Sequence, residues 1–319
     1  MASGKDIRRR IKSIKNTGKI TRAMEMVSAA KMRKAVLGVL QIREYAHSAW
    51  SILTNLARIF EKYEKKLLAV REVKNVLAIL VTSNRGLCGS FNSQIYKKVR
   101  DEVLHPEKLK INRVGTKKIE SRTPNDKLKI DFITVGKKGE DMVKKIGKEI
   151  IATFPESMFV PRMSDARAIG RIVMDEYINE KYDKVVIFYT DYISTLKQET
   201  RVRQILPVSK VDLEKQIAEM DILAKEYGLD EPETEYKIEP YPKKVLKMIF
   251  PRLIEMQIYH AILESNASKE SARMLAMKSA TDAAGEMADD LTLAYNQIRQ
   301  SKITQEISEI SAGRAALEG

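Results

Sequence analysis

The positions of the prolines divide this chain into three parts. All nine lie between Pro106 and Pro251 of the 319 residues, so both ends of the chain contain none. Proline inside an α-helix removes a backbone donor and costs about 3 kcal/mol. The two ends are therefore free to form long helices, whereas the middle is broken into shorter elements.

Apolar residues from about Lys5 to about Lys66 follow helical spacing. Three groups have steps of three or four residues: Ile7, Ile11 and Ile14; Ile20, Met24 and Val27; Leu53, Leu56 and Phe60. Such a stripe predicts an amphipathic helix with a seam for a partner helix. At about 1.5 Å per residue, sixty or so residues would extend roughly 90 Å, which is more than a globular domain of this size needs.

The C-terminal segment, from about Arg252 to Ser311, has a comparable length and a similar stripe. Its apolar residues form two groups with steps of four and three: Met287, Leu291, Ala294 and Ile298; Ile303, Ile307 and Ile310. Neither segment can bury its stripe alone. Because the lengths match, we expect the two segments to form a coiled coil with each other, and two unrelated long helices in a bundle are the alternative.

The middle of the chain alternates between apolar runs and helical patterns. Three runs are typical of buried strands: 76–81, 130–135 and 185–189. Helices are expected over 92–104, in the Lys-rich stretch after the second strand, and from a Ser164 cap to about Glu180. This alternation predicts a small parallel or mixed sheet, and 192–208 is expected to form a hairpin after it.

Two stretches of the middle part have the composition of surface insertions. Residues 105–129 are polar and basic, and residues 212–239 carry ten acidic against three basic side chains. Within the second, Leu213, Ile217 and Met220 predict a short amphipathic helix that ends near Gly228. We expect both insertions to be solvated.

The chain is strongly basic, with a net charge of +14 and a pI near 9.5. The first thirty-five residues hold eleven Lys or Arg and only two acids. This density fits contact with nucleic acid, with an anionic membrane or with acidic protein loops, or a merely solvated helix face. Aromatic residues that could stack on bases are absent before Tyr45, which disfavours single-stranded nucleic acid.

A glycine-bearing loop, Arg85-Gly86-Leu87-Cys88-Gly89, follows the first predicted strand. It has neither the spacing of a phosphate-binding loop nor that of a dinucleotide fingerprint, and no histidine motif offers a base for a catalytic cysteine. We interpret these five residues as a tight structural turn. A single cysteine excludes an internal disulfide, and one Cys with three scattered His offers no metal-ligand spacing. We therefore expect no catalytic residue, metal or cofactor.

We expect neither a membrane span nor a cleaved targeting segment in this chain, although composition alone does not distinguish the basic N-terminus from a mitochondrial presequence. No run approaches eighteen apolar residues, so no membrane span is expected. The basic N-terminus lacks the apolar core of a secretory signal, and its helical pattern continues past any plausible cleavage point, so it is interpreted as mature structure.

Motifs at both ends and in the middle resemble one known family. They are residues 5–11 (KDIRRRI), 16–34 (NTGKITRAMEMVSAAKMRK), 85–89 (RGLCG), 264–268 (ESNAS), 276–285 (AMKSATDAAG) and 295–310 (YNQIRQSKITQEISEI). In this order they resemble the gamma subunit of F-type ATP synthases. The resemblance implies an antiparallel, left-handed two-helix coiled coil beside a central Rossmann-like α/β domain. The corresponding domains would be 1–70, 71–250 and 251–319.

The resemblance also implies a function and partners. The chain would be the non-catalytic central-stalk rotor of a proton-translocating ATP synthase, coupling rotation of a c-ring to conformational changes in a hexamer of alpha and beta subunits, and it would also bind the epsilon subunit. It would lie peripherally at the cytoplasmic face of a bacterial cell membrane, without contact to nucleic acid. The residues that match contacts with the hexamer are Arg8, Arg9, Lys12, Met24, Arg299, Gln300, Thr304 and Glu306.

Two rival hypotheses are distinguishable from this one. A basic coiled-coil scaffold would bind nucleic acid or membrane with a steep dependence on salt. An enzyme on the Rossmann-like domain would lose its activity when Cys88 is replaced.

Overall fold

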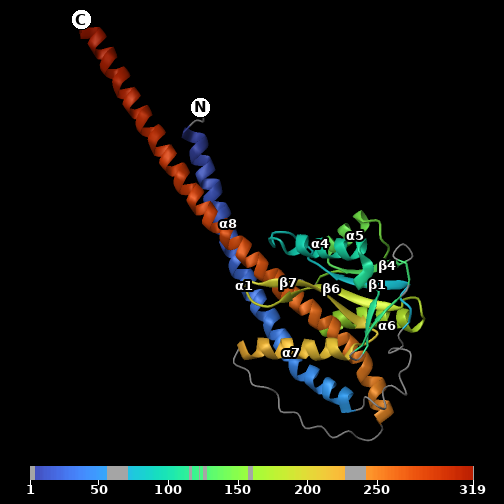
Figure 1. Cartoon of the computed structure of the whole chain (residues 1–319). Coiled ribbons are helices and arrows are strands. Elements are labelled where there is room, and N and C mark those ends of the chain that lie inside the picture. Colours follow the sequence, from blue (N-terminus) through green and yellow to red (C-terminus); the bar gives the residue numbers. More distant parts are fainter. Residues whose placement is uncertain are drawn as a thin grey trace. The chain divides into compact units, whose positions relative to one another are not determined.

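Two long helices carry the ends of the chain, α1 (Gly4–Asn55) and α8 (Pro242–Glu318) (Figure 1). A computed structural model describes residues 4–55, 71–114, 117–121, 123–124, 128–156, 161–226 and 242–318. By contacts the chain forms two compact units: the coiled-coil unit, residues 1–28 with 273–319, and the α/β unit, residues 29–272.

Both helices differ from their expected bounds. The N-terminal helix is described as far as Asn55, and the expected remainder to Lys66 lies outside the described residues. The C-terminal helix begins ten residues before the expected Arg252 and contains Pro251 in its interior. Proline removes one helical hydrogen bond there, but the neighbouring Phe250 and Leu253 are almost fully buried. Packing offsets the local penalty, so proline was a poor marker of this boundary.

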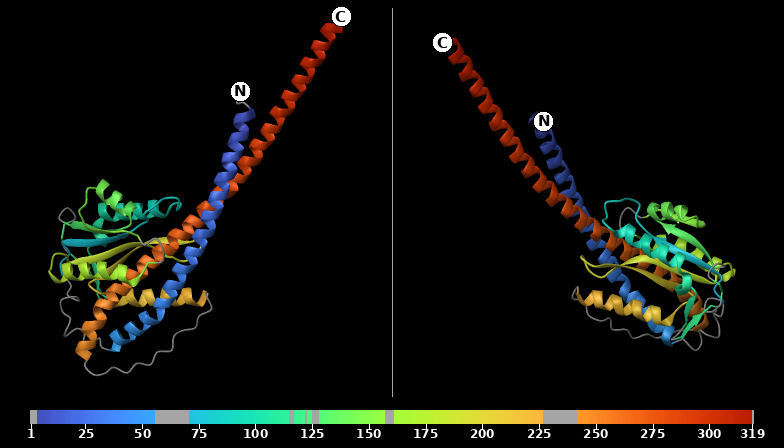
Figure 2. Two further views of the ribbon diagram at one scale, coloured as in Figure 1. Left: turned by 180° about the vertical axis from the view of Figure 1, so that it is seen from behind. Right: turned by 45° about the horizontal axis from the view of Figure 1, so that its top comes forward.

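In the coiled-coil unit the two helix ends run antiparallel, as both views of Figure 2 show. The hydroxyl oxygens of Thr21 and Thr281 are 2.7 Å apart. A Cβ placed on Gly18 would lie 3.4 Å from that of Ala284. Gly18 lies three residues before Thr21, and Ala284 lies three residues after Thr281. The two pairs therefore give the register of an antiparallel pair of helices.

The buried seam of α1 in this unit follows a heptad repeat. Its buried or half-buried positions alternate by four and three: Ile7, Ile11, Ile14, Gly18, Thr21, Glu25 and Ser28. A repeat averaging 3.5 residues winds two helices into a left-handed coil. The face of α8 that meets this seam has buried or half-buried residues at the same spacing of four and three: Met277, Thr281, Ala284, Ala288, Leu291 and Tyr295. The predicted antiparallel, left-handed coiled coil is confirmed.

Most of the large apolar residues that had been assigned to this seam lie outside it. Ile7, Ile11 and Ile14 are seam residues, but Ile20 and Val27 are exposed by 61% and 55%, and Met287 by 53%. The heptad phase instead brings small and polar residues to the interface after Ile14. Close approach through Gly, Ala, Ser and Thr replaces the interlocking of large side chains.

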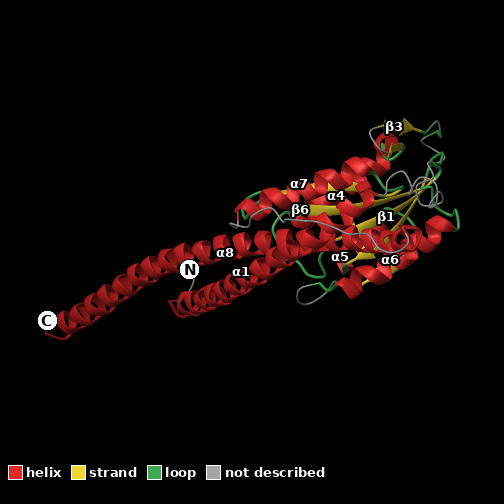
Figure 3. Cartoon of the chain, turned by 90° about the horizontal axis from the view of Figure 1, so that it is seen from below, coloured by secondary structure: helices red, strands yellow, loops and turns green. Residues whose placement is uncertain are grey.

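The α/β unit is built on a five-stranded sheet in the order β5-β4-β1-β6-β7. Its strands are yellow in Figure 3, where β1 and β6 are labelled. The strands are β1 (Asn75–Val81), β4 (Lys129–Val135), β5 (Ile150–Phe154), β6 (Lys184–Tyr192) and β7 (Gln198–Leu206). Neighbouring strands from β5 to β6 are parallel, and β7 pairs antiparallel with β6. The helices are α4 (Phe91–Leu104), α5 (Lys137–Lys145), α6 (Met163–Ile178) and α7 (Lys210–Glu226).

Both faces of this sheet are covered, and alternate residues of β1 point to opposite cores. Leu77 and Ile79 belong to a core that includes residues of α6, α7 and α8. Ala78 and Leu80 belong to a core with residues of α4 and α5. A parallel strand buried on both faces appears in sequence as a continuous apolar run, which is why residues 76–81 were recognisable.

Other parts of the α/β unit correct the sequence-based expectations. Strand β5 was not expected, and the hairpin placed at 192–208 is formed by β6 and β7. Residues 105–129 contain the 3-10 turn η1 (Pro106–Lys108) and a small hairpin of β2 (Ile111–Val114) and β3 (Lys117–Glu120). This segment is only partly solvated, because its buried residues include Pro106, Leu109, Lys110, Asn112, Thr123 and Leu128.

Two expected helices are present with different surroundings. The predicted amphipathic helix of the acidic segment is α7, but Ile217 and Met220 are core residues, so it is not a solvated insertion; Gly228 lies outside the described residues. Helix α6 begins before Ser164. Its first turn is closed by Asp165, whose carboxylate accepts the Arg162 N–H at 3.0 Å.

Candidate functional site

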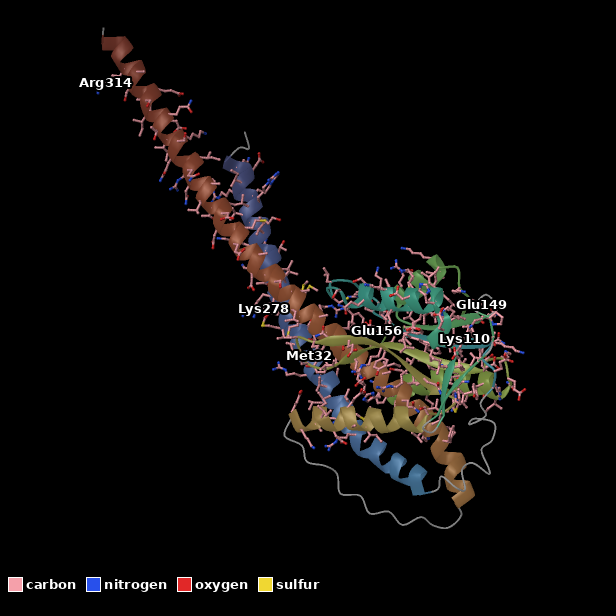
Figure 4. All side chains as sticks on the ribbon, viewed as in Figure 1. Met32, Lys110, Glu149, Glu156, Lys278 and Arg314 are labelled. Atoms are coloured by element: carbon pink, nitrogen blue, oxygen red, sulfur yellow. The ribbon has the colours of Figure 1, made fainter. Side chains whose placement is uncertain are left out.

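The distal end of α8 has no facing helix among the described residues of the coiled-coil unit. Continuing the Thr21–Thr281 register brings Gly4, the first described residue of α1, opposite Ile298. From Arg299 to Arg314 every α8 side chain is exposed, and Figure 4 shows side chains projecting around the helix near the labelled Arg314. Residues 299–314 therefore form a single helix whose side chains are all exposed.

The four predicted contact residues on α8 share one side of this bare helix. With about 3.6 residues per turn, Arg299, Gln300, Thr304 and Glu306 fall on the same half of the surface as three exposed isoleucines. Ile303, Ile307 and Ile310 are exposed by 48%, 59% and 72%. These isoleucines were expected in the coiled-coil seam, and that expectation was wrong because α1 does not reach them. They form a mixed apolar and polar stripe.

Local bonds on this stripe are weak. The Thr304 hydroxyl donates to the Gln300 carbonyl at 3.0 Å within the helix. The Lys302 ammonium lies 3.9 Å from the Glu306 carboxylate, and both side chains are largely exposed. Exposed pairs of this kind contribute about 0–1 kcal/mol. These side chains are therefore free to exchange their present contacts for those of a neighbouring protein.

The predicted contact residues on α1 lie on its outer surface. Arg8, Arg9 and Lys12 are exposed, whereas Met24 is half-buried beside the seam. Arg9 makes a surface ion pair with Asp6 at 3.6 Å. The structure therefore presents a basic face on this helix that an acidic surface can approach, and Met24 lies at the edge of that helix's seam.

The loop from Arg85 to Gly89 is a tight turn in the α/β unit. Leu87 and Gly89 have φ angles of 63° and 52°, in the left-handed region. The Phe91 N–H donates to the Cys88 carbonyl at 3.2 Å and so leads into α4. The Cys88 side chain is buried, and the Asn92 amide donates to its sulfur at 3.2 Å.

This environment does not suit Cys88 for nucleophilic catalysis. The thiol is only 2% exposed, and it contacts Ser83, Asn92 and the Arg85 carbonyl. A reactive cysteine needs an exposed, electropositive setting or an adjacent base. Across the described parts of the chain, no three His, Cys, Asp or Glu side chains come together as a possible metal site. Nor is any described helix long and apolar enough to cross a bilayer.

One cluster in the α/β unit was missed from the sequence. Polar residues of α8 between Glu264 and Ser271 are buried, although they interrupt an apolar helix face. Burial of this kind costs free energy unless each group is bonded. The available signal was the density of Glu, Ser, Asn and Lys in a segment flanked by apolar residues, which had been taken only as part of a family motif.

Comparisons with known proteins agree with this arrangement. The family model described as ATP synthase matches residues 3–317. An ATP synthase gamma chain of Legionella pneumophila (strain Corby) is 35% identical over 317 residues, covering 99% of this chain and all of that protein.

Two solved structures have a similar fold. A chain of the Euglena gracilis mitochondrial ATP synthase rotor in rotational state 1 has a TM-score of 0.59 at 17% identity, covering 94% of this chain and 98% of that one. A chain of the central stalk and c-ring of the Tetrahymena thermophila mitochondrial ATP synthase has a TM-score of 0.56 at 22% identity, covering 82% of this chain and 99% of that one. With the family model and the full-length relative, the chain belongs to the family of ATP synthase gamma chains.

Proposed function

We propose that this chain is the rotating central shaft of a proton-translocating ATP synthase, a non-catalytic subunit that couples rotation of a c-ring to conformational changes at the catalytic sites of an alpha/beta hexamer. The observation that carries this proposal is the bare distal end of α8, residues 299–314. An exposed helix with three large isoleucines on one side gains free energy when a partner covers them, at about 25 cal/mol per Å². A surrounding protein sleeve would provide that cover.

The hexamer contacts are part of this proposal. Arg299, Gln300, Thr304 and Glu306 would meet a beta-subunit loop, and Met24 with the basic residues Arg8, Arg9 and Lys12 would pass an acidic beta-subunit segment. A rotor must leave each contact as readily as it makes it. Exposed charged residues and a flexible methionine suit such weak, repeated contacts. The alternative of a basic scaffold for nucleic acid or membrane receives no support from the relatives.

The remaining partners would bind elsewhere on the chain. We assign the epsilon subunit and the c-ring to the α/β part, and retain the division into residues 1–70, 71–250 and 251–319 as the functional one. With its partners the chain would lie peripherally at the cytoplasmic face of a bacterial cell membrane. An acidic protein surface then accounts for the net charge of +14 without nucleic acid.

Reconstitution tests this function directly. The full chain is mixed with its cognate alpha and beta subunits, and the product is separated by size and weighed. We expect one chain per hexamer of alternating alpha and beta subunits, with ATP hydrolysis that drives rotation of a rod fixed to the chain. Absence of a complex, or a rod that stays still while ATP is hydrolysed, would overturn the proposal.

A further inference from the structure

A short stretch of α8 in the α/β unit is unusually polar for its burial. Each of the following side chains is at most 7% exposed: Glu264, Ser265, Asn266, Ser268, Lys269, Glu270 and Ser271. Apolar residues at these positions would avoid the cost of removing charges and hydroxyls from water. The retained polar groups must therefore be explained by the bonds they make.

Lys269 is bonded to the segment that follows β5. Its ammonium contacts the Glu156 carboxylate, and it also reaches the Asn266 side-chain oxygen at 2.7 Å and Glu270 at 3.2 Å. Glu156 follows β5 and borders a cavity of about 200 Å³ that Lys269 also lines; it is labelled in Figure 4. One ion pair thus links α8 to the segment that follows the edge strand β5.

Glu156 is held in turn by the turn that follows β1. Its second carboxylate oxygen accepts the Asn84 backbone N–H at 2.7 Å, and its carbonyl accepts the Asn84 side-chain amide at 3.1 Å. The Asn84 side-chain oxygen accepts the Lys137 N–H at the start of α5. Asn84 therefore holds Glu156 by two bonds, one to its carboxylate and one to its backbone carbonyl.

Two serines of α8 bond to a different part of the sheet. The Ser268 hydroxyl donates to the Thr190 carbonyl of β6 at 3.2 Å. The Ser271 hydroxyl donates to the Thr195 carbonyl, in the turn between β6 and β7, at 2.6 Å. We call Asn84, Glu156, Ser268, Lys269 and Ser271 the polar clasp. It holds α8 to the carboxyl ends of both halves of the sheet.

Directional bonds of this kind fix the position of a helix more strictly than apolar packing does. Burial of apolar surface is non-directional, so a helix in an apolar groove can roll or slide at little cost. Hydrogen bonds and ion pairs depend steeply on distance and angle. A buried ion pair adds little net stability but can fix one arrangement among several. α8 then continues without interruption from the clasp to Glu318.

We propose that the polar clasp is the positioning device that prevents α8 from slipping when torque is applied to the α/β unit. This inference rests on the proposed function, since it assigns to these residues the grip between the driven part of the rotor and its shaft. Lys269 and Glu156 act through α8 and need no contact with nucleotide. The clasp should therefore set mechanical stiffness far more than thermal stability.

The test uses the reconstituted complex with a rod attached to the α/β unit. The attachment point is Lys108→Cys, an exposed residue of η1, in a Cys88→Ser background. The complex is stalled, and the angular fluctuations of the rod report torsional stiffness. Lys269→Met alone would leave the buried carboxylates of Glu156 and Glu270 without this cation and destabilise the fold, so the informative variant is Lys269→Met with Glu156→Gln and Glu270→Gln. We expect wider fluctuations and lower torque with a melting temperature close to that of the parent.

A matched control removes an ion pair that does not touch α8. Lys181→Met with Glu176→Gln deletes the surface pair at the end of α6 by the same two types of substitution and should leave stiffness unchanged. If the clasp variant does not fold, Ser268→Ala with Ser271→Ala decides the question by the same readout. Unchanged stiffness in the clasp variant, or in this serine variant where the first fails to fold, would overturn the inference. Failure of the parent chain to assemble or rotate would instead refute the proposed function.

Discussion

Thr21 and Thr281 share a hydrogen bond of 2.7 Å between the two helices of the coiled coil. Each hydroxyl is also within reach of its own helix: Thr21 of the Gly18 carbonyl at 3.0 Å, and Thr281 of the Met277 carbonyl at 2.8 Å. Two hydroxyls have two protons for these three bonds. One threonine therefore donates across the interface while the other donates along its own helix.

Removing both of these hydroxyls should cost little more than removing one. Thr21→Val leaves the Thr281 hydroxyl in the seam without its partner across the interface, and we expect a loss of about 1 kcal/mol. Adding Thr281→Val removes the remaining polar group and should cost much less than a second such loss. Urea unfolding of the two single variants and the double variant measures the difference. Strict additivity would contradict a shared bond.

Gly18 offers a second test of the same interface. A Cβ at this position would lie 3.4 Å from that of Ala284, at ordinary contact distance. Alanine is favoured over glycine inside a helix by about 1 kcal/mol, so Gly18→Ala should raise the melting temperature of the coiled-coil unit. Gly18→Leu cannot fit at this separation and should lower it. Circular dichroism of both variants checks the prediction, and equal effects of the two would exclude close helix contact here.

These two residues also show why the seam was predicted only in part. The spacing of large apolar side chains predicts a seam, and Ile7, Ile11 and Ile14 are indeed seam residues. Beyond them the interface uses Gly18 and Thr21, whose size and polarity carry no hydrophobic signal. Only the spacing of seven residues marks them, and that spacing is recognisable once the phase is known.

In the α/β unit the predictable elements were those with a strong local pattern. Strand β1 is a continuous apolar run and was recognised, whereas β5 is five residues long and only partly buried. The candidate site divides in the same way. The positions of Arg299 and Glu306 could be carried over from motifs, but the exposure of Ile303 could not, because it depends on where α1 begins relative to α8 in three dimensions.

The buried pair Glu264 and His260 predicts an unusual dependence of stability on pH. Their side chains lie 3.3 Å apart. Burial, with Asp191 nearby, raises the pKa of Glu264 well above its ordinary 4.5; burial, with Arg203, lowers the pKa of His260 well below 6.5. Above pH 4.5 the unfolded chain releases the Glu264 proton while the folded chain keeps it. Folding stability contributed by this group therefore falls as pH rises toward the raised pKa.

Glu264→Gln removes that titration. Relative to the parent, we expect the variant to gain stability as pH rises above 4.5, by up to about 1.4 kcal/mol per pH unit, and to gain nothing below it. Denaturant unfolding across the acid and neutral range measures both proteins. His260 is present in both proteins. Its contribution to folding stability is lost as pH falls below 6.5, and this loss largely cancels in the stability difference between parent and variant. A difference independent of pH would show that Glu264 is ionised in the folded chain.

Charge reversal on the bare end of α8 should separate coupling from folding. The Arg299 side chain is exposed and lies on the side of α8 that carries Ile303, so Arg299→Glu should change stability by no more than about 0.5 kcal/mol. If this side meets the hexamer, the same change places a like charge against an acidic partner and weakens each contact during rotation. Met24→Lys on α1 places a cation against the acidic beta-subunit segment, so this contact is released less readily during rotation and coupling should also fall. Membrane vesicles carrying the assembled enzyme report the ratio of proton pumping to ATP hydrolysis, which we expect to fall in both variants. Arg171→Glu, at an exposed position of α6 away from the bare helix, serves as a charge-matched control. A ratio equal to that of the parent in both variants, with normal assembly, would remove Arg299 and Met24 from the coupling surface.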